Sequence, residues 1–110
     1  MIVTRLFVYG TLLDDAVAQD LLGHRPFGRP AVLKGYHREV DPAIGYPVIH
    51  PRDGALVAGK MLDVDADGLA ILDAYEGERY RRIIVQVETL EGRLLDAYVY
   101  VPAASPASRP

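Results

Sequence analysis

The chain has 110 residues, a formal net charge of −3, an apolar fraction of 50% and no cysteine. This length and composition predict one domain with its own hydrophobic core, and they exclude disulfides, thiolate metal sites and a cysteine nucleophile. The basic residues are scattered and Arg5 interrupts the N-terminal apolar run, so we expect no nucleic-acid partner, no membrane span or signal peptide, and a cytoplasmic location.

Residues 2–9 form the first predicted strand, since β-branched and aromatic residues dominate this run. Gly10 ends the strand and permits a sharp turn toward a helix. A turn between a strand and a helix leaves backbone N–H groups free to receive an anion or an oxyanion. A purely structural connection is the alternative interpretation, because no glycine-rich phosphate motif accompanies the turn.

The first predicted helix begins at a cap formed by Asp14 or Asp15 and ends near Gly23. Apolar residues repeat at a spacing of four along it, as Val17 and Leu21 do, which gives the helix one apolar face. Its expected length is about two turns.

Prolines and glycines are dense between residues 25 and 51, which predicts irregular strands wrapped around loops. The most strand-like pieces of this region are residues 31–40 and 46–50. Residues 55–64 alternate and are apolar enough for a further, separate strand.

A second helix is predicted to begin at a cap formed by Asp65 or Asp67 and to run to Gly77. Three apolar side chains are expected to face the core: Leu69, Ile71 and Leu72. The aspartates of residues 63–68 also follow the pattern DxDxDG with which an EF-hand calcium loop begins. Position twelve of such a loop is Ala74 instead of a glutamate, and the preceding segment is strand-like, so helix capping is the preferred interpretation.

Glu76 lies at the predicted C-terminal end of this helix, where the negative end of the helix dipole disfavours a carboxylate and raises its pKa. A carboxyl that breaks a local rule in this way is typical of functional sites. The alternative is a solvated surface glutamate paired with the arginines at positions 79, 81 and 82. The three histidines lack the short spacing of a metal site, and the only serines lie in the C-terminal tail, so neither a metal centre nor a serine triad is expected.

Residues 81–90 and 93–101 are two β-rich runs separated by Glu91 and Gly92, a loop length that favours a tight antiparallel hairpin. Residues 102–110 have little to bury and are predicted to form a flexible tail behind a domain of residues 1–101. About five or six strands with two helices predict an α+β fold or a small mixed barrel.

Two motifs lie far apart in the chain: Phe-Val-Tyr-Gly-Thr-Leu at residues 7–12, and Leu-Asp-Ala-Tyr-Glu-Gly at residues 72–77 followed by Tyr-Arg-Arg at residues 80–82. Together they resemble the γ-glutamylcyclotransferase-like (AIG2-like) family, over about residues 3–101. The resemblance implies the fold of that family, a small mixed, mostly antiparallel β-barrel with two short helices at its side. It also implies that Glu76 is the general acid/base. Substrate-binding roles are implied for six further residues: Tyr9, Gly10, Thr11, Leu12, Tyr46 and Tyr80.

The reaction that this resemblance implies is the cyclisation of a γ-glutamyl group to 5-oxoproline, with release of an amine or an amino acid. The nucleophile is the α-amine of the substrate, so no cofactor, metal or enzyme nucleophile is expected, and the expected partner is a small γ-glutamyl compound. γ-Glutamyl amino acids, γ-glutamylamines and a biosynthetic deprotection all fit this chemistry. The alternative function is a noncatalytic protein of the same fold that binds an acidic metabolite or a peptide end. No oligomeric state is predicted.

Overall fold

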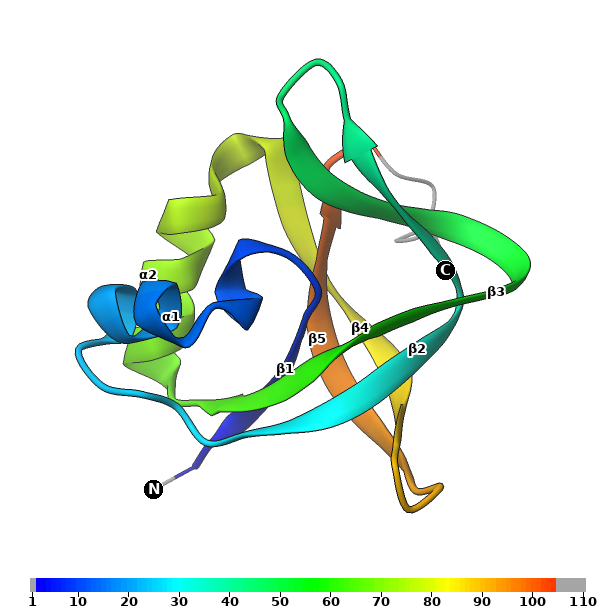
Figure 1. Ribbon diagram of the computed structural model, residues 1–110. Coiled ribbons are helices and arrows are strands. Elements are labelled where there is room, and N and C mark those ends of the chain that lie inside the picture. The colour runs from blue at the N-terminus through cyan, green and yellow to red at the C-terminus, as the bar shows by residue number, and fades with distance from the viewer. Residues whose placement is uncertain (1, 105–110) are drawn as a thin grey trace.

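Five strands close into a barrel, and two α-helices pack against one side of it (Figure 1). The computed structural model describes residues 2–104. Its elements in chain order are β1 (Thr4–Val8), η1 (Thr11–Leu13), α1 (Asp15–Leu22), β2 (Gly28–Asp41), β3 (Tyr46–Val64), α2 (Ala66–Glu76), η2 (Gly77–Arg79), β4 (Tyr80–Thr89) and β5 (Leu94–Pro102). The strand order around the barrel is β1, β3, β2, β4, β5; β1 and β5 are parallel, and the other neighbours are antiparallel. The predicted α+β, mostly antiparallel barrel is confirmed.

β2 and β3 form one long antiparallel hairpin that curves around the barrel (Figure 1). The predicted strand-like pieces at residues 31–40 and 46–50 lie within β2 and β3. The expectation of irregular strands wrapped around loops is wrong for most of this region, and residues 46–50 and 55–64 belong to a single strand. The prolines did not break this strand because β3 pairs with β1 only from Lys60 onward, and an open strand edge tolerates residues without an N–H donor. A register shift in β2 after Lys34 absorbs part of the bend.

Both helices begin at the predicted aspartate caps. The Asp14 carboxylate accepts a hydrogen bond from the Ala16 N–H at 2.9 Å, and the Asp65 carboxylate accepts one from the Gly68 N–H at 2.7 Å. Each bond satisfies a backbone donor that has no partner inside its helix. Gly23 ends α1 in the left-handed conformation expected of a helix C-cap.

The core-facing side of α2 differs from the prediction at one position. Leu72 is fully buried, whereas Ile71 is 42% exposed. Leu69 and Leu72 lie three residues apart on the same face, and a step of two residues from Leu69 to Ile71 turns about 200° around the helix, which points Ile71 outward. No helix in the described part of the chain is long and apolar enough to cross a membrane.

β4 and β5 form the predicted hairpin, but its loop has three residues instead of two. The Thr89 N–H donates to the Arg93 carbonyl at 2.9 Å, and the Gly92 N–H donates to the Thr89 carbonyl at 3.0 Å, so residues 90–92 make the turn. Gly92 has a φ of 85°, the left-handed angle that a three-residue hairpin loop requires. The predicted domain boundary at residue 101 stays a prediction: β5 includes Pro102, and residues 105–110 lie outside the described residues.

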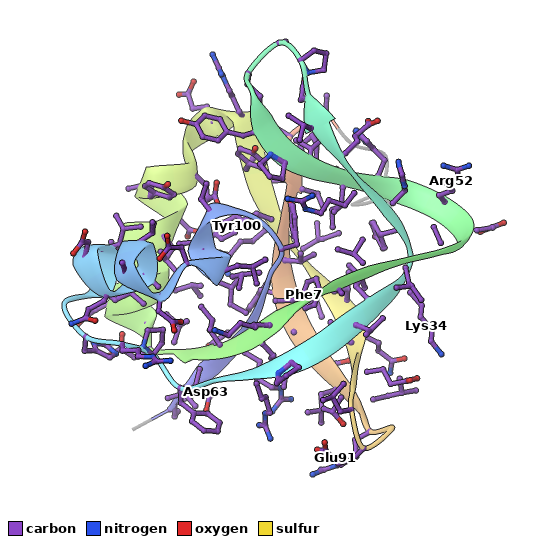
Figure 2. All side chains as sticks on the ribbon, in the orientation of Figure 1. Phe7, Lys34, Arg52, Asp63, Glu91 and Tyr100 are labelled. Carbon is purple, nitrogen blue, oxygen red and sulfur yellow. The ribbon has the colours of Figure 1, made fainter. Side chains whose placement is uncertain are left out.

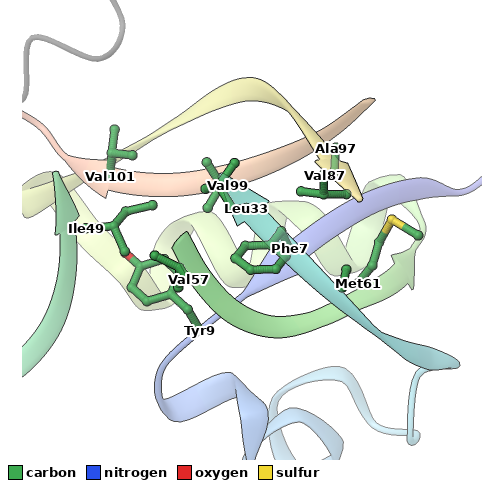
Figure 3. Packing of buried hydrophobic residues seen from close by; sticks show 11 residues of the cluster. Phe7, Tyr9, Leu33, Ile49, Val57, Met61, Val87, Ala97, Val99 and Val101 are labelled. Atoms are coloured by element: carbon green, nitrogen blue, oxygen red, sulfur yellow. The ribbon is translucent and has the colours of Figure 1, made fainter. Parts of the chain in front are cut away.

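The core has two parts, one on each face of β1. Phe7 points into the barrel interior, where it packs with residues from the other four strands (Figures 2 and 3). Leu6 and Val8 point to the opposite face and pack with Leu69 and Leu72 of α2. Because both faces of β1 are buried from Leu6 onward, residues 6–8 are all apolar instead of alternating with polar residues. This packing places the end of β1 beside the end of α2.

Candidate active site

A pocket of about 220 Å³ opens where β1 ends. Its walls come from the loop after β1, the turn between β2 and β3, and the C-terminal end of α2 with η2. All seven residues predicted for the site line this pocket: Tyr9, Gly10, Thr11, Leu12, Tyr46, Glu76 and Tyr80. Their roles in substrate binding and catalysis stay predictions.

Tyr9 anchors the loop at the buried end of the pocket. Its hydroxyl donates to the Tyr100 carbonyl at 2.6 Å, and its own carbonyl accepts from Arg38 Nε at 2.9 Å. Burial raises the pKa of the Tyr9 hydroxyl well above its ordinary value, so this group stays protonated and keeps its hydrogen bond. Tyr9 therefore holds the backbone of the loop in place.

Gly10 brings the loop close to the turn between β2 and β3. A side chain at this position would place its Cβ 3.3 Å from Pro47 Cγ, so a glycine fits best here. The Leu13 N–H donates to the Gly10 carbonyl at 2.9 Å, which closes the single turn of η1. This turn leaves the N–H groups of Gly10, Thr11 and Leu12 without an acceptor among residues 2–104, and these three residues line the pocket.

Glu76 is the last residue of α2, and it is half-buried. Within residues 2–104 its carboxyl makes no hydrogen bond or ion pair, so the alternative of a glutamate paired with surface arginines does not describe it. Burial raises the pKa of Glu76 to about 7. The direction agrees with the prediction, and its cause is the loss of water around the half-buried carboxyl. A carboxyl with this pKa exchanges protons readily at neutral pH.

A partly buried polar cluster ties the last turns of α2 to the barrel. The Asp73 carboxylate accepts from Arg82 Nε at 2.6 Å, from Arg82 Nη2 at 3.0 Å and from the Tyr100 hydroxyl at 2.7 Å. Arg82 also lies over the ring of Tyr98, with its Cζ 4.6 Å from the ring centroid. The Arg82 guanidinium holds the pKa of Asp73 below its ordinary value. Because Asp73 lies one turn before Glu76, this cluster fixes the helix end that carries Glu76.

Tyrosines form much of the rim of the pocket. Tyr46 and Tyr75 are 54% and 43% exposed, and the Tyr75 hydroxyl lies 3.4 Å from Thr11 Oγ1. Tyr80 is more buried, and its hydroxyl donates to the Pro47 carbonyl at 3.3 Å. Burial raises the pKa of Tyr80 above its ordinary value. These contacts join the three walls of the pocket to one another.

Sequence reasoning missed several lining residues: Ile44, Pro47, Tyr75, Arg79 and Tyr100. Tyr75 and Arg79 lie close to Glu76 in the sequence, and this closeness could have indicated them as residues of the site. Ile44 comes from the turn between β2 and β3, and Pro47 is the second residue of β3. Tyr100 reaches the site only because β5 lies beside β1 in the closed barrel.

A barrel whose pocket combines a Tyr-Gly-Thr-Leu loop with a buried glutamate at a helix end defines the class to which this protein belongs. The chain is a member of the family described as gamma-glutamyl cyclotransferase, AIG2-like, whose model matches residues 6–110. The family resemblance predicted from the two motifs is thereby confirmed.

Individual relatives agree with this assignment. Protein AIG2 C of Arabidopsis thaliana is 35% identical over 105 residues, which cover 92% of this chain and 64% of that protein. The solution structure of an Arabidopsis thaliana protein is 32% identical, with a TM-score of 0.87, and the match covers 98% of this chain and 68% of that one. A solved structure named gamma-glutamyl cyclotransferase has a TM-score of 0.82 over 92% of this chain and 67% of its own; at 20% identity, that likeness shows the fold alone. The chain thus spans about two thirds of the length of these relatives.

Proposed function

We propose that this protein is a γ-glutamylcyclotransferase-type enzyme that converts a γ-glutamyl compound into 5-oxoproline and a free amine or amino acid. The observation that carries the proposal is the Glu76 carboxyl, which has a pKa of about 7 and lines the same pocket as the open N–H groups of the loop from Gly10 to Leu12. Family membership and the fold shared with a protein named gamma-glutamyl cyclotransferase support it.

The reaction begins when Glu76 accepts a proton from the α-ammonium of the substrate. The freed amine attacks the side-chain carbonyl carbon of its own glutamyl group, forming a carbon–nitrogen bond and closing a five-membered ring. The carbonyl oxygen becomes negative, and N–H groups of Gly10 and Thr11 stabilise it or hold the substrate carboxylate. The bond to the leaving nitrogen then breaks as Glu76 returns the proton. Two protons leave the α-nitrogen in total: Glu76 carries the first to the leaving nitrogen, the second passes from the new ring nitrogen to water, and the released amine takes up a proton from water to become an ammonium at neutral pH.

The pocket suits this chemistry because the substrate supplies both the nucleophile and the electrophile. The protein then has to fold the substrate into a reactive geometry, for which the fixed backbone around Tyr9 and the rigid end of α2 provide two reference points. Holding the reacting groups in the correct relative orientation lowers the activation barrier by several kcal/mol.

The test is a screen for 5-oxoproline release across γ-glutamyl amino acids, γ-glutamyl peptides and γ-glutamylamines. We expect Glu76→Gln to lower kcat by about 100-fold or more, because glutamine keeps the shape of the side chain but carries no exchangeable carboxyl proton. Glu78→Gln is the matched control, since Glu78 is exposed and lies outside the pocket, and its kcat should equal that of the wild type.

Unchanged turnover in Glu76→Gln contradicts the assignment of the proton carrier. Absence of turnover by the wild type on every compound contradicts the enzymatic function itself. If γ-glutamyl compounds then still bind in the pocket, the protein belongs to the alternative class of noncatalytic binding proteins.

A further inference from the structure

The pocket contains two opposite charges that do not neutralise each other. Glu76 is its only acidic lining residue among residues 2–104, and Arg79 is its only basic one. The Arg79 side chain makes no hydrogen bond or ion pair within the described part of the chain, and neither does the Glu76 carboxyl. Two unpaired charges in one pocket are suited to a ligand that carries both a positive and a negative group.

The two charges lie at different depths. Glu76 is half-buried, whereas Arg79 is exposed and lies on η2, beside the exposed rim tyrosines Tyr46 and Tyr75. The Arg79 charge favours ionisation of the Tyr80 hydroxyl at this rim, while the raised pKa of Glu76 follows from burial. The Arg79 guanidinium and the Glu76 carboxyl line the same pocket but form no ion pair with each other.

The backbone of Arg79 is held in place. Its carbonyl accepts a hydrogen bond from the Ala103 N–H at 2.8 Å, which ties η2 to the chain just beyond β5. Tyr80, the next residue, begins β4 and anchors its hydroxyl on the Pro47 carbonyl. Arg79 thus projects from a fixed point at the mouth of the pocket, and only its side chain has to adjust to a ligand.

We propose that Arg79 selects substrates whose leaving group carries a carboxylate, which makes γ-glutamyl amino acids and γ-glutamyl peptides the substrate class in preference to γ-glutamylamines. The inference rests on the proposed function, in which the α-amine of the γ-glutamyl group lies near Glu76. The leaving group then extends toward the mouth and brings its carboxylate to Arg79. A planar guanidinium binds a carboxylate through two parallel hydrogen bonds, and a chain with a net charge of −3 needs such a local cation to attract an anion.

The experiment compares γ-glutamylalanine with γ-glutamylethylamide, which has the same leaving nitrogen and carbon chain but no carboxylate. We expect the wild type to favour γ-glutamylalanine by about tenfold in kcat/KM, the effect of one hydrogen-bonded charge pair. Arg79→Gln should remove this preference through a higher KM for γ-glutamylalanine at unchanged kcat, because the pairing is the same in the ground state and the transition state. Arg79→Lys should restore part of the preference, and Arg93→Gln, an exposed arginine at the far hairpin, should leave it intact.

Equal kcat/KM values for the two compounds in the wild type overturn the inference, and so does an equal loss for both in Arg79→Gln. If the wild type turns over neither compound, the selection by Arg79 is tested by binding instead, and the proposed function fails only if every other γ-glutamyl compound of the screen is also left unchanged. Titrations of both compounds followed by NMR then support the inference if γ-glutamylalanine binds more tightly and Arg79→Gln abolishes the difference. Equal binding, or no binding of either compound, overturns it.

Discussion

The Glu76 carboxyl loses part of its water when α2 packs beside the barrel, and this burial raises its pKa to about 7. In the unfolded chain a glutamate titrates near pH 4.3. Between these two values the folded protein binds more protons than the unfolded chain does, so the stability associated with this group is fully present below about pH 4 and is lost as the pH rises through about 7.

Because the pKa of Glu76 is raised in the folded state, we expect Glu76→Gln to unfold at a higher temperature than the wild type at pH 8, where the wild type carries a half-buried charge. At pH 4.5 the two proteins should have nearly the same Tm, because the carboxyl is then protonated in the folded state. Thermal unfolding followed by circular dichroism at both pH values measures the difference. Glu78→Gln, which changes an exposed carboxyl, should show no such pH dependence. The same Tm difference for Glu76→Gln at both pH values contradicts the raised pKa.

Asp73 shows how a residue outside the pocket determines where Glu76 lies. Asp73→Asn keeps the size of the side chain but removes the charge that pairs with Arg82. We expect the free energy of unfolding to fall by about 1–2 kcal/mol at pH 7, less than for a fully buried charge pair because Asp73 is partly exposed. The pKa of Asp73 is lowered, so its contribution is present above about pH 4 and is lost as the pH falls further.

Urea unfolding at pH 7 and pH 3 measures this contribution. Asp63→Asn is a suitable control, because the Asp63 side chain makes no hydrogen bond or ion pair within residues 2–104. A loss of stability in Asp73→Asn that is as large at pH 3 as at pH 7 speaks against the ion pair as its cause.

Among the elements, the hairpin of β4 and β5 depends on one glycine. Gly92 adopts a φ of 85° in the three-residue loop, and a side chain with a Cβ is strained in that conformation. Gly92→Ala should therefore lower the free energy of unfolding by about 1 kcal/mol. The preceding loop residue, Glu91, does not adopt a left-handed backbone angle. We therefore expect the free energy of unfolding of Glu91→Ala to stay within about 0.5 kcal/mol of the wild type. Denaturant titrations of the two variants make the comparison, and equal effects contradict the assignment of the turn.

The whole barrel closes tightly around a second glycine, Gly59 of β3. A Cβ at this position would overlap the Val8 carbonyl oxygen and lie 2.8 Å from Phe7 Cζ, so Gly59→Ala forces β1 and β3 apart. We expect a loss of about 3 kcal/mol or more in the free energy of unfolding. Because the Phe7 backbone leads into the loop at residues 9–12, the same variant should also weaken ligand binding.

Gly28→Ala is the matched control for this prediction. The nearest atom to a Cβ there would be Leu62 Cδ2, at 2.7 Å, which is the end of a side chain instead of the backbone oxygen that a Cβ on Gly59 would overlap. Its stability should fall less than that of Gly59→Ala in the same urea titration. A larger effect of Gly28→Ala would show that the contact between β1 and β3 does not limit the packing of the barrel.

The sequence by itself determined the features that depend on neighbouring residues. The two aspartate caps, the left-handed Gly23, the hairpin of β4 and β5, and the position of Glu76 at the end of a helix all follow from local backbone preferences. The same local rules failed where proline and glycine in β3 suggested interruptions, because whether a proline breaks a strand depends on whether that edge is paired.

Only the tertiary structure decided what surrounds the site. The Tyr9 hydroxyl meets the Tyr100 carbonyl across 91 residues of sequence, and this contact exists because β1 closes the barrel between β3 and β5. The same closure buries Glu76, and burial raises its pKa by removing the water that stabilises a charge. Local sequence determines which residues end a strand or a helix, but the loss of water around a carboxyl depends on all the elements that pack against it.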